Sequence, residues 1–116
     1  MNDLLWQKSL FTTTTNGGGE LFTKPTILAA GDTQPIVQLT SAVVTANAAP
    51  TAIVNLQVGS PGQTVVVMFG DANTTVDFTG TNLHGNGGAD WAAPIYSSMT
   101  CTTPDGTVWY CRLGIG

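Results

Sequence analysis

The sequence is short of charged side chains. Asp, Glu, Lys and Arg make up 9% of its 116 residues, against about 25% in an ordinary soluble domain. Residues 33–70 contain none of the four. A neutral surface rich in Thr, Asn and Gln can belong to a monomeric β-sandwich, but uncharged strand edges pair readily with other strands. We therefore expect an obligate oligomer in which sister copies cover the neutral strands, with the Thr-rich monomer as the alternative.

Basic side chains are the scarcest of the charged ones. Three Lys and Arg stand against seven Asp and Glu, which gives a net charge of −4. Nucleic acids and anionic membranes both attract basic surfaces, so neither partner is expected. No apolar run approaches the roughly 20 residues of a membrane span. Asp3 and Lys8 also make the N-terminus unlike a signal peptide, and we expect synthesis in a cytoplasm without a classical export signal.

The sequence contains two cysteines, Cys101 and Cys111. The segment between them, "TTPDGTVWY", is typical of a hairpin turn. With a two-residue loop Cys101 would face Tyr110, and with a bulge at Gly106 it would face Trp109. Neither register places the two cysteines opposite each other. We therefore expect free, packed thiols and no zinc site.

The first 34 residues differ in composition from the rest. The stretch "TTTTNGGGE" (12–20) is typical of a flexible linker. We predict that residues 1–34 form an extended N-terminal arm with this Gly/Thr-rich linker, and that residues 35–116 form a β domain. The arm would become ordered by docking on another subunit or partner, or by packing back on its own domain. Its predicted contact residues are Leu4, Leu5, Trp6, Leu10, Phe11, Leu21 and Phe22.

Short strands are indicated throughout the rest of the chain. In "TAIVNLQV" (51–58) the apolar residues alternate, which places Val54, Leu56 and Val58 on one face and Ile53 on the other. Residues 64–69 are apolar at every position after the first Thr, which predicts a strand covered on both faces. No amphipathic helix is evident.

An 11-residue spacing relates these strands. It separates Val54, Val65 and Val76, and it is typical both of an antiparallel meander and of the rungs of a stacked β-helix. Three short solenoids wound together would close into a prism without exposed edges. We predict an all-β domain of short strands in a β-helix, β-prism or sandwich-like arrangement. Its predicted core or subunit-interface residues are Val54, Leu56, Val65, Val67, Phe69, Val76, Phe78 and Trp109.

Three stretches carry a resemblance to a known class of proteins. "GSPGQTVVVMFGDANTTV" (59–76), "TNLHGNGGADW" (81–91) and "DGTVWYCR" (105–112) resemble the short β-helical or β-prism modules of tailed-phage virion proteins. With its arm and compact acidic domain, the chain looks like a small capsid decoration (cement) or head-fibre protein. That resemblance implies a homotrimer on the capsid exterior of the virion, bound to the major capsid protein through its N-terminal arm. A tail fibre, spike or adaptor subunit is the alternative.

Residues that could carry chemistry are few. His84 is the one histidine, no Gly-x-Ser-x-Gly elbow exists, and the nearest carboxylate pair, Asp71 and Asp77, is explained by a turn and a polar strand face. We predict no enzymatic activity, no cofactor and no metal site, although three copies of His84 could meet on a three-fold axis. The aromatic residues of the C-terminal third leave a carbohydrate-binding module open, since they can form a sugar platform as well as anchor a core or an interface. They are Trp91, Tyr96, Trp109 and Tyr110.

Overall fold

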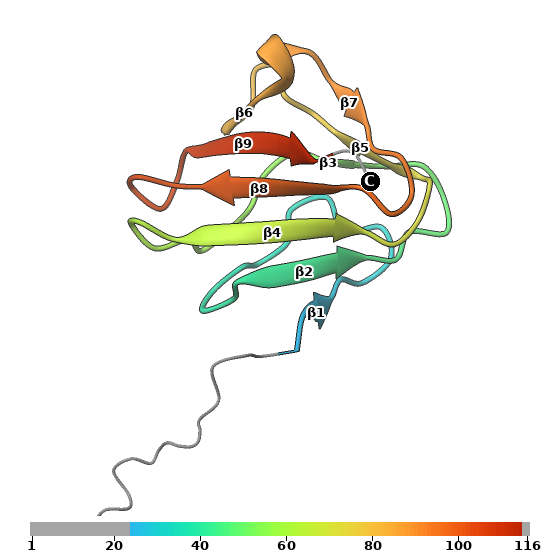
Figure 1. Ribbon diagram of the computed structural model, residues 1–116, viewed down its shortest axis with the longest axis horizontal. Coiled ribbons are helices and arrows are strands. Elements are labelled where there is room, and N and C mark those ends of the chain that lie inside the picture. Colours follow the sequence, from blue (N-terminus) through green and yellow to red (C-terminus); the bar gives the residue numbers. More distant parts are fainter. Residues whose placement is uncertain (1–23, 115–116) are drawn as a thin grey trace, which may run out of the picture.

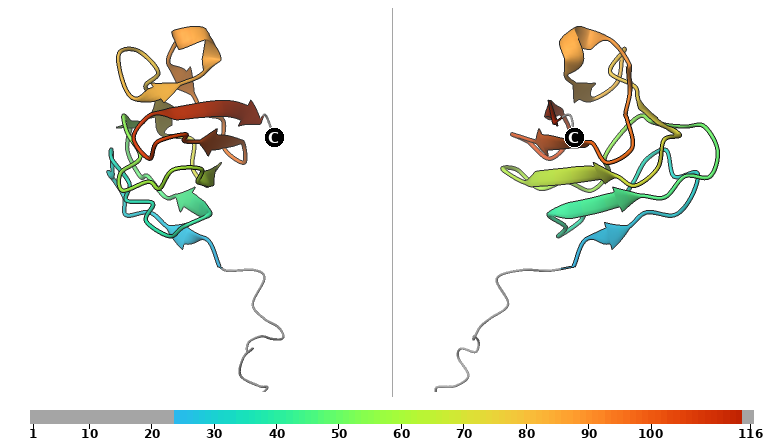
Figure 2. Two further views of the ribbon diagram at one scale, coloured as in Figure 1. Left: turned by 90° about the vertical axis from the view of Figure 1, so that its left-hand side faces the viewer. Right: turned by 45° about the vertical axis from the view of Figure 1, so that its right-hand side comes forward.

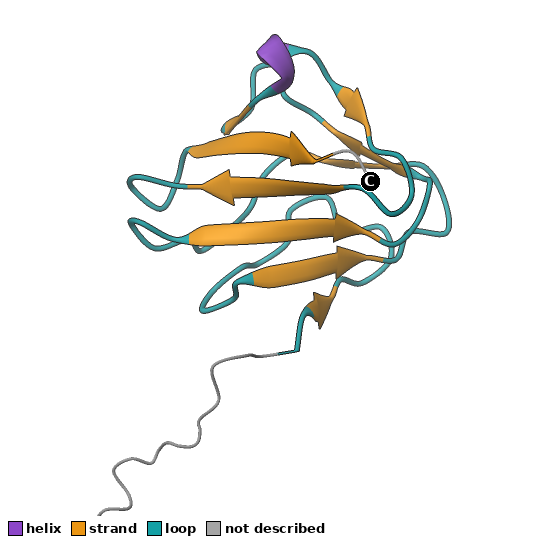
Figure 3. Ribbon diagram, viewed as in Figure 1, coloured by secondary structure: helices purple, strands orange, loops and turns teal. Residues whose placement is uncertain are grey.

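The computed structural model describes residues 24–114, and in this part the chain is all-β. Its strands form two sheets, one with the order β1-β2-β4-β8-β9-β6 and one with the order β3-β5-β7 (Figures 1 and 3). One short 3-10 turn, η2 (Asn86–Gly88), is the helical element of these residues. The strands are β1 (Thr26–Ile27), β2 (Ala42–Thr45), β3 (Thr51–Ile53), β4 (Thr64–Phe69), β5 (Thr74–Val76), β6 (Leu83–His84), β7 (Trp91–Ala92), β8 (Ser98–Thr102) and β9 (Trp109–Gly114).

Successive strands of the first half alternate between the two sheets. β2 and β4 pair in parallel, with Val43 opposite Val67, while β3 and β5 pair in parallel, with Ile53 opposite Val76. Paired residues of these strands are therefore about two 11-residue spacings apart in sequence. One spacing of 11 residues takes the chain from a strand of one sheet to a strand of the other, and two spacings bring it back to the first sheet.

The C-terminal half closes the sheets with antiparallel strands. β8 lies between β4 and β9 and is antiparallel to both, and β7 is antiparallel to β5. β6 pairs in parallel with β9 and ends the larger sheet. The turned views show β1, β2, β4, β8 and β9 stacked one above another (Figure 2).

The core lies between the two sheets and is centred on Trp109. The Trp109 side chain is fully buried, and its Nε1 donates a hydrogen bond to the Leu56 carbonyl oxygen at 3.1 Å. A Cβ added at Gly59 would lie 2.6 Å from the Trp109 ring, so only glycine fits there. Of the residues predicted for a core or interface, those buried in this single chain are Leu56, Val65, Val67, Phe69, Val76, Phe78 and Trp109.

Val54 departs from that set. It is half-buried, and Ile53 fills the core in its place. β3 ends at Ile53, after which the Val54 N–H donates to the Thr33 carbonyl oxygen at 2.8 Å. The alternation predicted through residues 51–58 was wrong because the chain turns out of the sheet there, and Val58 ends 51% exposed.

The prediction of free cysteines was also wrong. Cys101 and Cys111 lie directly opposite each other in the β8–β9 hairpin and form a disulfide. The connecting loop is longer than either predicted turn. It is held by the Asp105 carboxylate, which accepts hydrogen bonds from the Thr107 and Val108 N–H groups, both at 2.9 Å. These two bonds also hold the pKa of Asp105 below its ordinary value.

The folded unit begins earlier than residue 35. Leu28 is buried, and its N–H donates to the Val44 carbonyl oxygen at 2.9 Å. The Gly31 N–H donates to Asn47 Oδ1 at 2.7 Å. Residues 24–34 are therefore part of the β domain, which corrects the predicted boundary. All the predicted arm contacts, from Leu4 to Phe22, lie outside the described residues.

Candidate functional site

The larger sheet has one face toward the core and one outer face. Neighbouring residues of a strand point to opposite faces, so Val65, Val67 and Phe69 of β4 are buried while Val66 and Met68 point outward. Register continues this pattern across the sheet. Outward positions are occupied by Ile27, Ala42, Val44, Thr64, Val66, Met68, His84, Ser98, Thr100, Thr102, Tyr110 and Arg112.

Charge is nearly absent from this outer face. The six strands of the sheet contain no carboxylate, and Arg112 is their one charged residue. The acidic side chains of the described residues lie in the turns and loops outside these strands. The face therefore carries a single positive charge and no negative one, on a chain whose net charge is −4.

One half of the outer face is apolar. A shallow hollow of about 510 Å³ lies over the C-terminal ends of β2 and β4, where Val44 is opposite Met68. Ile27 of β1 is opposite Val44 and is 64% exposed, which extends the apolar row to the edge of the sheet. The hollow is lined by Val44, Val66, Met68, Phe69, Gly70, Tyr96, Ser97 and Ser98.

Tyr96 stands at the rim of this apolar hollow. Its side chain is 80% exposed, and its φ of 70° lies in the left-handed region that few residues other than glycine adopt. Two hydrogen bonds hold the backbone there, from Tyr96 N to the Phe69 oxygen at 2.8 Å and from Phe69 N to the Ser97 oxygen at 2.9 Å. A conformation of this kind persists only when its surroundings enforce it, and here it holds an aromatic ring out in solvent.

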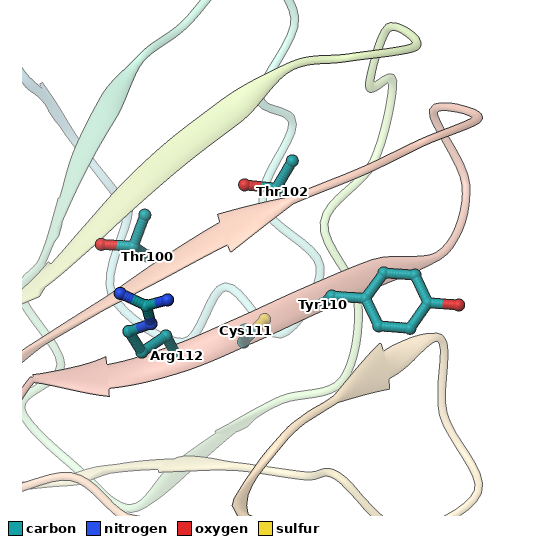
Figure 4. A pocket seen from close by; sticks show the side chains of 5 residues that line it. All are labelled: Thr100, Thr102, Tyr110, Cys111 and Arg112. Carbon is teal, nitrogen blue, oxygen red and sulfur yellow. The ribbon is translucent and has the colours of Figure 1, made fainter.

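The other half of the outer face is polar. A second hollow of about 490 Å³ is lined by two threonines of β8 and by Tyr110, Cys111 and Arg112 of β9 (Figure 4). The Arg112 side chain reaches toward Thr100, and the Tyr110 ring projects away from the threonines. That ring stacks on His84, with 5.6 Å between the ring centroids. Hydroxyls, one cation and a stacked ring can together bind a small polar or anionic group.

Asp71 supports the edge of the sheet next to the apolar hollow. Its carboxylate accepts hydrogen bonds from Asn47 N at 2.9 Å, Asn73 N at 2.7 Å and Thr74 Oγ1 at 2.8 Å. Burial raises the pKa of Asp71, but these bonds and one from Thr45 outweigh it and hold the pKa below its ordinary value. A carboxylate with so many donors ties the turns that follow β2 and β4 together, a structural task.

A third hollow lies beside the loops at the opposite end of the strands. It measures about 350 Å³ and is lined by Gln34, Asn55, Leu56, Gln57, Val58, Gly106 and Thr107. Asn55 Oδ1 is buried and accepts no hydrogen bond from the described residues. Such an acceptor costs free energy until a donor reaches it. The hollow contains amides and hydroxyls but no charged group.

The aromatic residues proposed for a sugar platform are not brought together. Trp109 is buried in the core, and Trp91 is half-buried against Phe69 in an edge-to-face contact with 5.4 Å between centroids. Tyr96 and Tyr110 are exposed, but they lie over different halves of the outer face. The four rings therefore do not form one platform, and Trp109 serves the core, which is the other role considered for these residues.

Asp71 and Asp77, the carboxylates considered for catalysis, accept hydrogen bonds within turns. Asp77 accepts a hydrogen bond from the Thr79 N–H at 2.9 Å, and Asp71 is occupied as described. His84 is exposed and stacked on Tyr110. Residues 24–114 contain no group of three His, Cys, Asp or Glu side chains that could hold a metal ion, and no helix long and apolar enough to cross a membrane.

Most residues of the outer face were not singled out from the sequence. Val66 and Met68 lie in the apolar run of residues 64–69, and the alternation within that run was the available signal.

The chain was compared with protein-family models, with curated proteins and with solved structures, and none of them matches it.

Proposed function

We propose that the chain is a non-enzymatic structural protein of a phage virion. In this proposal it is a homotrimeric decoration (cement) protein that binds and stabilises the outer capsid shell. Its N-terminal arm reaches the major capsid protein or a neighbouring subunit. The observation that carries the proposal is the outer face of the six-stranded sheet. This face has one charged side chain, is half apolar and has no described element of its own chain to cover it. Faces of this kind are typical of surfaces buried in assemblies.

The stacking of strands supports a short β-helical module. β2 pairs in parallel with β4, and β3 pairs in parallel with β5, as strands of successive rungs of a solenoid do. Two such rungs bury little surface on their own, and neighbouring chains would supply the missing contacts. A subunit that prefers the intact shell to free coat protein stabilises the shell by mass action.

Sedimentation and shell binding test this function. The purified full-length chain is expected to sediment as a trimer at micromolar concentration and to bind assembled shells rather than free coat protein. Removal of residues 1–20 is expected to abolish shell binding if the arm is the contact. A compact monomer that leaves the shells unoccupied would contradict the proposal.

A carbohydrate-binding module is the second candidate, and the polar hollow of the outer face favours it. Thr100, Thr102 and Arg112 offer hydrogen-bonding groups beside the exposed Tyr110 ring. A glycan array separates the two functions. Binding that is lost on Tyr110→Ala without loss of folding would favour the module, and an array without binding would exclude it.

A further inference from the structure

Arg112 has no carboxylate beside it in the six strands of its sheet. It is exposed on the outer face of β9, and its side chain reaches toward Thr100 (Figure 4). The acidic side chains of residues 24–114 lie in loops, where each accepts hydrogen bonds from backbone N–H groups or threonine hydroxyls of the loops. They are Asp32, Asp71, Asp77, Asp90 and Asp105. Among these residues the guanidinium donors of Arg112 are therefore not used by a carboxylate.

Hydroxyl groups lie beside Arg112 on the same face. Thr100 of β8 is directly opposite Arg112 in the sheet. Thr102, two residues along β8, is opposite Thr64 of β4, and their Oγ1 atoms form a hydrogen bond at 3.0 Å. That bond uses the proton of one hydroxyl only, so the other hydroxyl of the pair still has a proton to donate. The polar hollow therefore combines a cation with hydroxyl donors and acceptors.

An aromatic surface borders the same hollow. Tyr110 is 59% exposed, and its ring stacks on His84 with an angle of 29° between the two planes. Tyr110 and Arg112 are two residues apart on one face of β9, which separates their Cα atoms by about 7 Å. This separation is comparable with the length of one pyranose ring and its carboxyl group. An aromatic face and a few placed polar groups are typical of a small-ligand site.

The charges around the hollow favour a ligand with one negative group. Arg112 is the one charged residue of the sheet, and the chain carries a net charge of −4, which opposes a polyanion such as a nucleic acid. A guanidinium binds a single carboxylate through two parallel N–H···O bonds. Asp105 lies in the loop between β8 and β9, which is closer along β9 to Tyr110 than to Arg112. A ligand carboxylate is therefore directed to Arg112, and uncharged hydroxyls are directed toward Tyr110.

We propose that the polar hollow binds a uronic acid residue of a glycan, with the sugar carboxylate on Arg112. Thr100 and Thr102 bind the sugar hydroxyls, and the Tyr110 ring packs against the pyranose ring. The hollow of about 490 Å³ lies within the range of about 300–1,000 Å³ of small-ligand sites. This inference goes beyond a structural role in a virion. It rests on the second candidate function, carbohydrate binding, and names the ligand class.

An NMR titration of the isotope-labelled full-length chain tests the inference with two matched sugars. Methyl glucuronide carries a carboxylate where methyl glucoside carries a hydroxymethyl group, and sodium acetate supplies a carboxylate without a sugar. We expect the glucuronide to bind about tenfold or more tightly than the glucoside or acetate, because it alone engages both the guanidinium and the hydroxyls. The largest amide shifts are expected at Thr100, Thr102, Tyr110 and Arg112.

Two matched charge variants make the result specific. Arg112→Gln removes the cation from the hollow, whereas Lys24→Gln removes the other basic side chain of residues 24–114, which precedes β1 and lies outside the hollow. The first is expected to reduce the preference for the glucuronide to less than about twofold, and the second to leave it unchanged. Arg112→Lys keeps the charge without the two parallel bonds and should retain part of the preference. Amide spectra of the variants without ligand verify that the fold is retained.

Several results would overturn the inference. Equal affinity for the two sugars rejects the acidic ligand and leaves the carbohydrate-binding candidate intact. Acetate that binds as tightly as the glucuronide contradicts sugar recognition, and equal losses in the two glutamine variants contradict a site at Arg112. Shifts confined to other surfaces contradict the location. No binding of the glucuronide rejects the inference, while the glycan array decides separately whether the chain binds carbohydrate at all.

Discussion

The inner and outer faces of β4 are built from similar side chains but have different surroundings. Val65, Val67 and Phe69 are buried between the sheets, whereas Val66 and Met68 from the same run line an open hollow. Composition alone does not separate the two sets, because both are apolar. Position in the pleat does, because it buries one set between the sheets and leaves the other on the outer face.

The largest difference in stability between inner and outer residues is expected for substitution of Trp109. Trp109→Ala removes the central core side chain and its hydrogen bond to Leu56. We expect a loss of about 3–5 kcal/mol in the free energy of unfolding. Tyr110→Ala, on the outer face one residue along, is the control and should cost less than about 1 kcal/mol. Denaturant unfolding measures both, and equal costs would break the comparison.

The disulfide is expected to have the next largest effect. Cys101 and Cys111 lie toward the core side of the sheet, ten residues apart in sequence. Their replacement by Ser in a double variant should lower the unfolding free energy by about 2–3 kcal/mol, mainly because the unfolded chain regains freedom. Thermal unfolding with and without reductant compares the reduced and the disulfide-bonded forms of the unmodified chain. A reductant that leaves the melting temperature unchanged would contradict the bond's role.

Loss of the Asp71 network should have a smaller effect that depends on pH. The folded pKa of Asp71 lies below its ordinary value of 3.8, so the ionised form is favoured by folding. Its contribution is fully present above the unfolded pKa and is lost as the pH falls through the folded pKa. Asp71→Asn should cost about 1–3 kcal/mol at neutral pH. The variant should also lose part of the acid dependence of stability between about pH 5 and pH 2. Unfolding curves across that range measure it, and identical acid profiles would show that the network contributes nothing.

The smallest effect on the single chain is expected on the outer face. Met68→Thr keeps a strand-forming residue and gives up little buried surface within one copy. We expect a change below about 1 kcal/mol in the unfolding free energy of the dissociated chain, together with weaker association. Sedimentation at several concentrations measures the association. A large loss of monomer stability would mean that the outer face already belongs to the core.

Much of the core could be predicted from the sequence because alternation and apolar character act locally. Phe69, Val76 and Phe78 were found in this way. The disulfide was missed because the hairpin register depends on how the Asp105 carboxylate organises a longer loop. Val54 was misplaced because nothing in its neighbours marks the turn after Ile53. Residues 24–34 were assigned to the arm on composition, although Leu28 and Gly31 bind a segment far along the chain.

The candidate surface was harder to predict than the core. Val66 and Met68 were recognised as apolar, but which face each would occupy depends on the partner strands β2 and β8. Tyr96 gains its exposed position from a backbone conformation that no sequence pattern marks. Arg112 becomes the one charge of the sheet only after six separate segments have been paired.

The parallel stacking of β2 on β4 and of β3 on β5 has a consequence for how the molecule can change in size. Because β2 to β5 alternate between the two sheets, a duplicated pair of consecutive strands would add one strand to each sheet and widen both together. The core between the sheets would then gain area without becoming thicker.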